Sequence, residues 1–255
     1  MEEQMRGILI LDFGGQYTQL IARRVRECGV YSCVLPYTAG IEQIREENPR
    51  GIILSGGPAS VLEEGAPRID PAVFALGVPV LGICYGMQLM AHLMGGTIER
   101  GEQREYGRAT VSMDATQSGL LKGMKAESVC WMSHTFQVTR PPQGFSVIAH
   151  TVNCPVAAMA DEERGLYGVQ FHPEVTHSEE GMTLLRNFLM EICSAQADWS
   201  MEAYAERAVE QIRAQVGEGT VLLGLSGGVD SAVAAALLYR AIGKRLTCVY
   251  VDHGF

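Results

Sequence analysis

Short apolar runs typical of buried strands alternate, in the first part of the chain, with segments whose apolar residues recur at helical spacing. This alternation limits the fold most, because parallel strands need a crossover between them and helices normally supply it. The strand-like runs cover residues 7–11, 32–35, 51–54 and 78–81, and the helix-like segments cover 17–26, 41–46 and 86–94. The sequence therefore predicts a mixed α/β fold with a mainly parallel sheet flanked by helices.

Further along, the strand-like runs are separated by turns and not by helices, which predicts a more antiparallel section of the same domain. These runs cover residues 109–113, 128–132, 146–150, 156–160 and 166–170. A helix-like segment over 178–193 closes the unit, and residues 194–198 have the composition of a linker. We therefore place the first domain at residues 1–195.

The remaining residues, 196–255, read as the beginning of a second α/β domain. A helix over 201–216 is followed by a strand over 220–225, an alanine-rich helix over 232–242 and a strand over 246–251. A two-stranded fragment leaves open sheet edges and an uncovered apolar face. We therefore expect the natural protein to be longer than this chain.

The charge and cysteine content favour small-molecule partners in a reducing compartment. The formal net charge is -9, with the acidic residues spread along the chain, which argues against nucleic acid or an anionic membrane as partner. No apolar stretch approaches the ~20 residues of a membrane span, and the opening MEEQ is unlike a secretory leader. The seven cysteines are scattered without C-x-x-C spacing. We expect a cytoplasmic protein.

Residues 80–88 (VLGICYGMQ) combine an apolar strand, a Gly-x-Cys-x-Gly turn and the start of a helix. This is the nucleophile elbow pattern with sulfur in place of oxygen, in which the flanking glycines permit the tight turn. The helix N-terminus favours a thiolate at Cys84, and the backbone N–H of Tyr85 would face a tetrahedral oxyanion. A strand that runs into the glycine pair at residues 56–57 predicts a second oxyanion donor among the amides of that pair.

A candidate base follows in residues 168–174 (GVQFHPE), where a strand ends at His172. Positions two apart in an extended segment share a face, so Glu174 can orient the imidazole and complete a Cys-His-Glu triad. Taken singly, the cysteine pattern also fits a buried core residue and the His-Pro-Glu segment a loop. The chain order and the strand ends together favour catalysis. We interpret His92, His150 and His177 as structural or solvated.

A second glycine-rich loop lies in residues 223–231 (LGLSGGVDS), between a strand and a helix. Its successive backbone N–H groups can form an anion-binding nest at the positive end of the helix. Asp230 could contact phosphate only through a cation, which predicts a magnesium contact. The alternative is a glycine turn capped by serine and aspartate. The loop lacks the Gly-Lys-Ser/Thr of a Walker motif.

Three separated segments, 54–58, 82–88 and 170–174, resemble the class-I glutamine amidotransferases. The resemblance implies that Cys84 attacks the side-chain amide of glutamine, that His172 gives the proton to departing ammonia, and that water hydrolyses a γ-glutamyl thioester. Gly57 and Tyr85 would hold the oxyanion. The residues implied to bind the α-amino and carboxylate groups of glutamine are Gln88, Ser133, His134, Thr135 and Phe136.

The loop at 226–231 resembles the Ser-Gly-Gly-x-Asp-Ser loop of the N-type ATP pyrophosphatases. These enzymes adenylylate an oxygen and then displace AMP with a nitrogen nucleophile. The resemblance implies ATP and Mg²⁺ as cofactors, with Asp230 as the metal contact. The residues implied to bind ATP are Ser226, Gly227, Gly228, Val229, Asp230, Ser231 and Ala232. Asp252, after the next strand, is either a further ligand or a solvated strand end.

The order of the two domains and the opening motif at 12–17 (DFGGQY) resemble the GMP synthetase family. This implies a ligase of purine nucleotide biosynthesis that converts XMP, ATP and glutamine to GMP, AMP, pyrophosphate and glutamate, and that can form a homodimer when full length. The chain departs from the family at Thr135 and Phe136, where Gly-Asp is common; contacts through backbone groups would preserve binding. We expect this chain to hydrolyse glutamine and to make no GMP.

Two other interpretations remain. The same triad could serve another acceptor, as in cytidine triphosphate or carbamoyl phosphate synthesis, or hydrolyse γ-glutamyl peptides. The loop at 226–231 weighs against these. A non-catalytic module that only binds glutamine or nucleotide has no need for an intact Cys84, His172 and Glu174.

Overall fold

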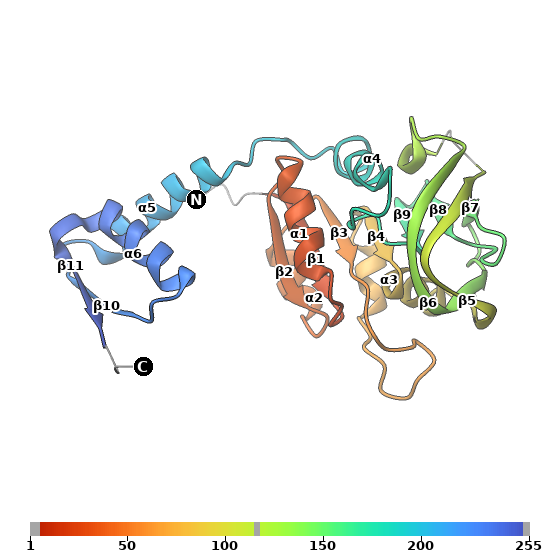
Figure 1. Cartoon of the computed structure of the whole chain (residues 1–255), viewed down its shortest axis with the longest axis horizontal. Coiled ribbons are helices and arrows are strands. Elements are labelled where there is room, and N and C mark those ends of the chain that lie inside the picture. Colours follow the sequence, from red (N-terminus) through yellow and green to blue (C-terminus); the bar gives the residue numbers. More distant parts are fainter. Residues whose placement is uncertain (1–5, 115–117, 252–255) are drawn as a thin grey trace. The chain divides into compact units, whose positions relative to one another are not determined.

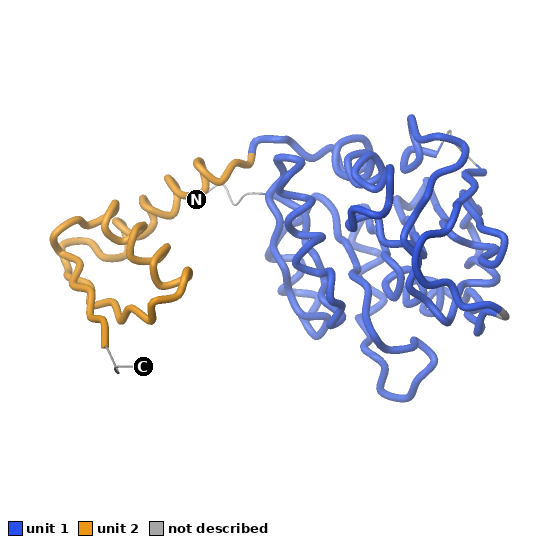
Figure 2. Tube along the Cα trace, in the orientation of Figure 1, with its two compact units in different colours: residues 1–198 blue, residues 199–255 orange. Residues whose placement is uncertain are grey.

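The chain folds into two compact units, residues 1–198 and residues 199–255 (Figure 2). The computed structural model describes residues 6–114 and 118–251. Each unit has its own sheet. Along the described ranges, no helix combines the length and the apolar character needed to cross a membrane.

The first unit is built on one nine-stranded sheet with the order β2-β1-β3-β4-β9-β8-β7-β5-β6 (Figure 1). The first five strands in this order run parallel, and the other four pair antiparallel. Their bounds are β1 Ile8–Asp12, β2 Ser32–Pro36, β3 Gly51–Leu54, β4 Val80–Ile83, β5 Thr97–Met113, β6 Glu127–Arg140, β7 Ser146–His150, β8 Ala158–Asp161 and β9 Leu166–Val169. The predicted mixed α/β fold is confirmed.

Helices cover both faces of this sheet, which explains why its parallel strands consist mainly of apolar residues. The helices are α1 Thr18–Glu27, α2 Ile41–Glu46, α3 Tyr85–Leu93 and α4 Gly181–Arg186. In β1, Ile8 and Ile10 pack into a core cluster with residues of α1 and α4. The alternate residues Leu9 and Leu11 belong to a second cluster with residues of α2 and α3. Alternation along the strand therefore separates two cores.

The antiparallel section differs from the prediction in the length of β5 and β6. The predicted runs at 109–113 and 128–132 are only the apolar ends of two long strands. The rest of β5 carries charged residues such as Arg100 and Glu105, between which the register with β6 shifts. Exposed charged residues such as Arg100 and Arg104 hide the strand in the sequence, because an edge pair needs only one buried face.

The helix predicted over 178–193 begins later, at Gly181, and continues after Arg186 as a π-helical turn over Asn187–Ile192. The preceding residues are held by β6 instead. The Ser178 hydroxyl accepts from the backbone N–H of Trp131 at 3.0 Å and donates to the carbonyl of His172 at 2.6 Å. Local side-chain hydrogen bonds of this kind compete with helix formation.

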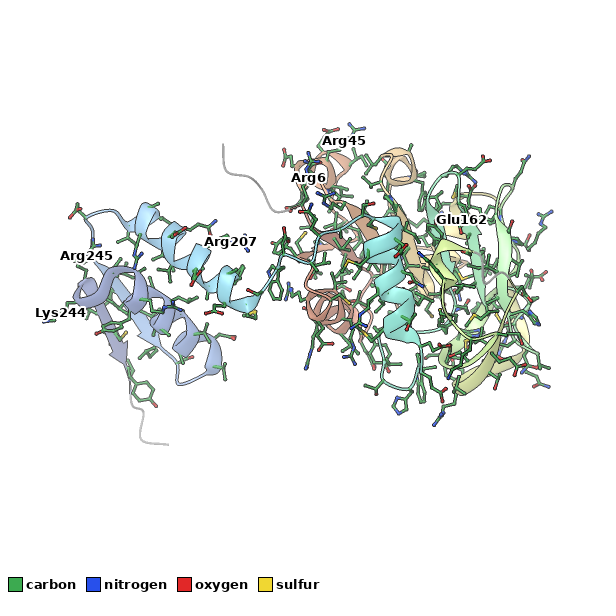
Figure 3. All side chains as sticks on the ribbon, turned by 90° about the horizontal axis from the view of Figure 1, so that it is seen from above. Arg6, Arg45, Glu162, Arg207, Lys244 and Arg245 are labelled. Atoms are coloured by element: carbon green, nitrogen blue, oxygen red, sulfur yellow. The ribbon has the colours of Figure 1, made fainter. Side chains whose placement is uncertain are left out.

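The second unit contains α5 Met201–Val216, β10 Val221–Leu225, α6 Val229–Ile242 and β11 Leu246–Tyr250. The two strands are parallel, as expected for a βαβ unit. Arginines bind free carbonyls at the helix ends. Arg213 donates to the carbonyl of Ala241 at 3.0 Å, and Arg245, labelled in Figure 3, donates to the carbonyl of Gly219 at 2.9 Å.

Candidate active site

Cys84 lies at the turn between β4 and α3, and its own backbone is strained. Its φ of 51° and ψ of -104° fall where residues with a side chain are rare. The backbone N–H of Cys84 donates to the carbonyl of Val169 at 2.8 Å, which anchors the turn to β9. A strained strand-to-helix turn is the nucleophile elbow geometry, which exposes the reactive atom above the sheet.

The flanking glycines permit the turn through close backbone approach and not through a positive φ. Neither Gly82 nor Gly86 has a positive φ. A Cβ on Gly82 would lie 2.6 Å from backbone atoms of Gly86 and Met87, and a Cβ on Gly86 would overlap the carbonyl of Leu54. The glycines are needed because strand and helix backbones pass close together, while the strained turn is made by Cys84 itself.

Replacing Gly86 with alanine is expected to lower the free energy of unfolding by about 1–3 kcal/mol, because the added methyl group has no room. Gly40→Ala is the matched control: Gly40 has a φ of -70° and no atom within 4 Å of an added Cβ. Its expected cost is a few tenths of a kcal/mol, roughly that of losing an N-cap glycine. Thermal unfolding measures both. Equal midpoints for the two variants would contradict this packing.

His172 and Glu174 form a buried pair. The two residues are 5% and 1% exposed, and His172 Nδ1 lies 2.7 Å from Glu174 Oε1. The sequence predicted that this contact is made along an extended segment. In the structure it is made across a turn after β9. The turn is held from outside. Arg24 of α1 donates to the backbone carbonyl of Glu174 at 2.9 Å, and the His172 N–H donates to that of Trp131 at 3.0 Å.

The surroundings of His172 favour its charged form. Burial disfavours the imidazolium, but the hydrogen bonds and negative charges of Cys84 and Glu174 outweigh it and raise the pKa of His172 to about 10. At neutral pH the ring therefore carries a proton. A protonated imidazole beside a sulfur is the arrangement of a thiolate–imidazolium pair, in which the ring is ready to protonate a leaving group.

The raised pKa predicts how stability depends on pH. The proton on His172 binds more tightly in the folded state, so its stabilising effect is complete below the unfolded pKa of about 6.5. It is lost as the pH rises through the folded pKa of about 10. The difference in unfolding free energy between the wild type and His172→Asn should therefore shrink over this range. Chemical denaturation at a series of pH values measures it, and a constant difference would contradict the charged pair.

Two pockets meet at Cys84. One, of about 300 Å³, brings together Cys84 and all of the residues predicted to bind the substrate and its oxyanion. The other, of about 200 Å³, lies against His172 and the loop 14–17 after β1. The predicted residues in the first pocket are Gly57, Tyr85, Gln88, Ser133, His134, Thr135 and Phe136. The sulfur therefore has a ligand-sized space on one side and the candidate base on the other.

The two predicted oxyanion donors have backbone N–H groups available. Tyr85 is the first residue of α3, where an N–H has no acceptor inside the helix. Gly57 follows β3 in a loop. Within the described residues, neither N–H donates to a backbone acceptor in a turn, loop or helix cap. Both line the first pocket with Cys84, as an oxyanion hole requires.

The predicted glutamine-binding residues offer mainly hydrogen-bond acceptors and backbone groups. Gln88 Nε2 donates to the Phe136 carbonyl at 2.7 Å and to Gln170 Oε1 at 3.0 Å. Both N–H groups of that amide are engaged, so Oε1 is the atom left for a ligand that can donate. Thr135 Oγ1 lies 2.8 Å from the hydroxyl of Tyr106, a β5 residue in the same pocket that the sequence did not single out.

Residues 9–192 match the family model described as glutamine amidotransferase class-I. The chain belongs to this family. Residues 201–252 match the model described as NAD synthase. The two matches follow one another in the order of the two sequence motifs, while the domain bounds stay a prediction.

Among curated relatives, the chain is similar to the glutamine-hydrolysing GMP synthase of Acetivibrio thermocellus, with 58% identity over 97% of this chain and 48% of that protein. The corresponding enzyme of Symbiobacterium thermophilum is 56% identical over 100% of this chain and 50% of its own length. The chain thus spans about half the length of the curated relatives it matches. A candidate GMP synthase component from Thermoplasma acidophilum has a similar structure, with a TM-score of 0.67 and 29% identity over 81% of this chain and 98% of its own.

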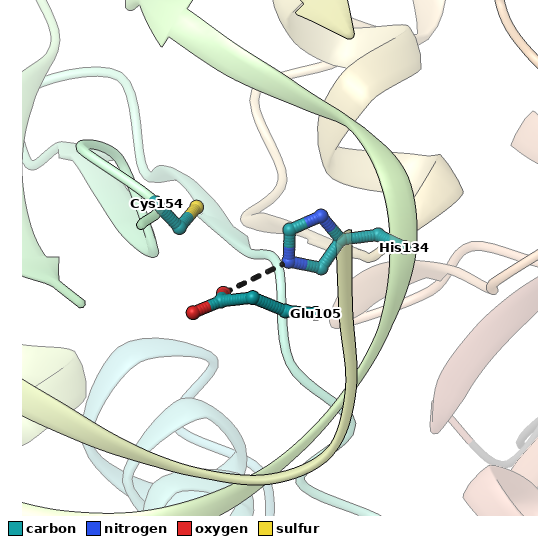
Figure 4. Close-up of side chains that lie close together, drawn as sticks. All are labelled: Glu105, His134 and Cys154. Atoms are coloured by element: carbon teal, nitrogen blue, oxygen red, sulfur yellow. Dashed lines mark hydrogen bonds and ion pairs between the residues drawn. The ribbon is translucent and has the colours of Figure 1, made fainter. Parts of the chain in front are cut away.

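Beside the amidotransferase pocket lies a buried cluster of Glu105, His134 and Cys154, whose potential ligand atoms all lie within 4.8 Å of one another (Figure 4). His134 Nε2 lies 3.2 Å from Glu105 Oε2, and Thr151 donates to Glu105 Oε1 at 2.8 Å. Cys154 Sγ donates to the carbonyl of Val156 at 3.5 Å.

Hydrogen bonds link Glu105 to His134 and, through Thr151, to the backbone N–H of Cys154. Burial lowers the pKa of His134, against the raising effect of Glu105, so the ring is neutral at pH 7. Burial, with a contribution from Glu105, raises the pKa of the Cys154 thiol to about 12. This network joins β5, β6 and the loop before β8, which fixes the strand that carries Ser133 and Thr135.

In the second unit, residues 226–228 join β10 to the N-terminus of α6. Gly227 has a φ of 79°, and the hydroxyls of Ser226 and Ser231 lie 3.1 Å apart across the loop. Asp230 is exposed in the first turn of α6. The N–H of Ala232 already donates to the Gly228 carbonyl at 3.2 Å, so Ala232 cannot offer it to phosphate. Asp252 and His253 lie outside the described residues.

Sequence reasoning missed several residues that support the site. Gln170 stands inside the His-Pro-Glu segment but was given no role. Ser178 and Arg24 hold the backbone of the histidine segment, and Tyr17 packs its ring edge-on against His172 with centroids 5.2 Å apart. Only Gln170 carried a sequence signal, since a glutamine at the end of an apolar strand is buried and must find partners.

Proposed function

We propose that this chain hydrolyses glutamine to glutamate and ammonia as the amidase part of a GMP synthase. The observation that carries the proposal is the strained elbow at Cys84, placed between a pocket with two available N–H groups and a buried His172–Glu174 pair. The similarity to glutamine-hydrolysing GMP synthases at 53–58% identity supports the choice of acceptor.

In the first half of the reaction, the Cys84 thiolate attacks the side-chain carbonyl carbon of glutamine. The oxygen becomes an oxyanion that accepts from the N–H groups of Gly57 and Tyr85. When the C–N bond breaks, His172 gives its proton to the leaving nitrogen, and ammonia departs. A γ-glutamyl thioester on Cys84 remains. Glu174 stabilises the imidazolium before this transfer and holds the ring in one tautomer.

In the second half, His172 is neutral and acts as the base. It takes a proton from water, whose oxygen attacks the thioester carbon. The same N–H groups hold the second oxyanion. Expulsion of the sulfur as a thiolate breaks the C–S bond and releases glutamate, which restores the thiolate–imidazolium pair. No group outside the triad and the oxyanion donors is needed for these proton transfers.

The remaining contacts with glutamine are proposed from the lining of the first pocket. Oε1 of Gln88 can accept from an α-ammonium group, since its N–H groups are engaged. Ser133, Thr135 and Phe136 contribute backbone groups of β6. Because the His134 ring is neutral and faces Glu105, its contribution is also through the backbone. Backbone recognition accommodates the unusual Thr135-Phe136 pair.

For the rest of the enzyme, we propose that residues 196–255 begin the domain that uses ATP and XMP, after an amidotransferase domain at 1–195. The division into units at residue 198 and the family match over 201–252 support this. The loop over Ser226, Gly227, Gly228, Val229, Asp230 and Ser231 would bind pyrophosphate, without the N–H of Ala232, which is already engaged. The exposed carboxylate of Asp230 fits one magnesium ligand beside phosphate oxygens.

The full-length protein is further proposed to work in the cytoplasm and to form a homodimer, without nucleic acid or membrane partners.

The experiment that tests the amidase is incubation of the purified chain with glutamine. We expect glutamate and ammonia in equal amounts. With XMP and ATP added, we expect no GMP from this chain, because it spans only about half the length of the GMP synthases that it matches. If glutamate is not released and Cys84 does not react selectively with a glutamine-like electrophile, the proposal is wrong.

A further inference from the structure

Gln170 is the residue after β9, and its side chain is wholly buried at 0% exposure. Since β9 pairs with β4, the end of β9 lies beside the elbow that carries the thiol. Gln170 Nε2 lies 3.5 Å from the sulfur of Cys84, and its Oε1 accepts from Gln88 Nε2 at 3.0 Å. A buried amide thus joins the thiol to a second amide.

The direction of these hydrogen bonds is fixed from outside. Gln88 Nε2 also donates to the backbone carbonyl of Phe136 at 2.7 Å. A carbonyl can only accept, so the amide of Gln88 must present its nitrogen there. The same nitrogen faces Gln170, which must therefore present its oxygen. The remaining end of the Gln170 amide, its NH₂ group, is left facing the sulfur.

A donor aimed at sulfur favours one charge state of that atom. A thiolate accepts a hydrogen bond strongly, whereas a thiol sulfur is a weak acceptor. The carbonyl of Ser133 lies 3.8 Å from the sulfur and can accept from an S–H, but its negative oxygen repels a thiolate. The Gln170 N–H stabilises negative charge on the sulfur, whereas the Ser133 carbonyl destabilises it. The N–H is in place whenever the sulfur is a thiolate, including when the thiolate is expelled from the thioester.

We propose that Gln170 is a positioning residue for the amidase: it aims an N–H donor at the sulfur of Cys84, and the Phe136 carbonyl sets the direction of that donor through Gln88. This inference rests on the proposed function, because it assigns a role at the same thiol. Phe136 and Gln88 also line the first pocket. The strand β6, which we propose to contact glutamine, therefore also orients the Gln170 amide beside Cys84.

The test is the pH dependence of Cys84 alkylation by iodoacetamide, measured for each cysteine peptide by mass spectrometry. Gln170→Met keeps the length of the side chain and removes the donor. Its midpoint for Cys84 alkylation is expected to rise by about one pH unit, the size of a charge-assisted hydrogen bond, with kcat for glutamate release lowered about tenfold. Gln170→Glu should raise the midpoint further, because an oxygen then faces the sulfur.

Two more variants complete the design. Gln137→Met is the matched control: Gln137 is also a buried glutamine, on β6, but it donates to the carbonyl of Asn153 at 3.1 Å, away from the thiol. Its midpoint should equal that of the wild type. Gln88→Met removes the hydrogen bond that orients the Gln170 amide. It should raise the midpoint of Cys84 alkylation by less than Gln170→Met does. Gln88→Met also tests the proposal if Gln170→Met does not fold. An unchanged midpoint in Gln88→Met would show that the Phe136 carbonyl does not direct the Gln170 donor through Gln88.

The outcomes separate this inference from the proposed function. If wild-type Cys84 is alkylated no faster than the exposed Cys248 and no glutamate is released, the amidase itself is wrong. A reactive wild-type Cys84 together with an unchanged midpoint in folded Gln170→Met leaves the amidase standing and overturns only the role of Gln170.

Discussion

Glutamate release by Cys84→Ala is expected to fall by about 10⁴-fold or more relative to the wild-type chain, because the thioester route is removed altogether. The loss should lie in kcat and not in binding. The pocket that we propose for glutamine is built from β6, Gln88 and the loop at Gly57, which the substitution leaves in place. A radiolabelled or coupled glutamate assay measures the loss, and glutamine protection against thermal unfolding measures the binding that should remain.

The matched control is Cys248→Ala, because Cys248 is an exposed thiol of β11 in the other unit. Its turnover should equal that of the wild type. Residual turnover of Cys84→Ala within tenfold of the wild type, roughly the effect of one lost hydrogen bond, would show that the thiol is not the nucleophile.

Glu174→Gln is expected to lower kcat for glutamate release by about 10³–10⁴-fold, which is the range for removing the charge of an orienting carboxylate in a triad. In this variant, the side-chain amide oxygen at position 174 can still accept from His172 Nδ1. Two things change. The imidazolium loses its negative partner, and an NH₂ group replaces Oε2, a buried atom with no hydrogen-bond partner among the described residues. The fall in kcat should therefore come with a lower pH for loss of the His172 proton, read from the pH profile.

Glu162→Gln is the control for this change. Glu162, labelled in Figure 3, accepts from Ser118 Oγ and Tyr167 in a different surface pocket that contains no predicted site residue. Its turnover and pH profile should be unchanged. Should Glu174→Gln keep both the rate and the pH profile of the wild type, the pair of His172 and Glu174 would be structural only.

The parts of the fold that the sequence predicted well are those with a single dominant signal. β1, β3 and β4 are buried on both faces, so their residues are apolar throughout and bounded by turns. β5 gave no such signal, since it carries Arg100 and Glu105 within a strand. The latter is buried only because His134 and Thr151 are brought to it by β6 and by the loop after β7. Its burial depends on tertiary contacts that no local pattern records.

In the candidate site, too, the residues in short motifs could be predicted from the sequence, and the residues that position them could not. Cys84, His172 and Glu174 were found because each stands in a contiguous motif at a strand end. What positions them is not contiguous. Arg24, which holds the turn at Glu174, lies 150 residues earlier in the chain. The donor that faces the sulfur is fixed by the carbonyl of Phe136, a backbone atom that carries no information about residue type.

The most direct test of the covalent mechanism is an acid quench of the chain during turnover of glutamine, followed by mass spectrometry of the cysteine peptides. We expect one glutamyl group on the peptide that carries Cys84 and none on the other six cysteines. The adduct should be absent in Cys84→Ala and should disappear when glutamine is exhausted. Release of glutamate with no adduct on Cys84, or with an adduct on a different cysteine, would contradict the assignment of Cys84 as the nucleophile.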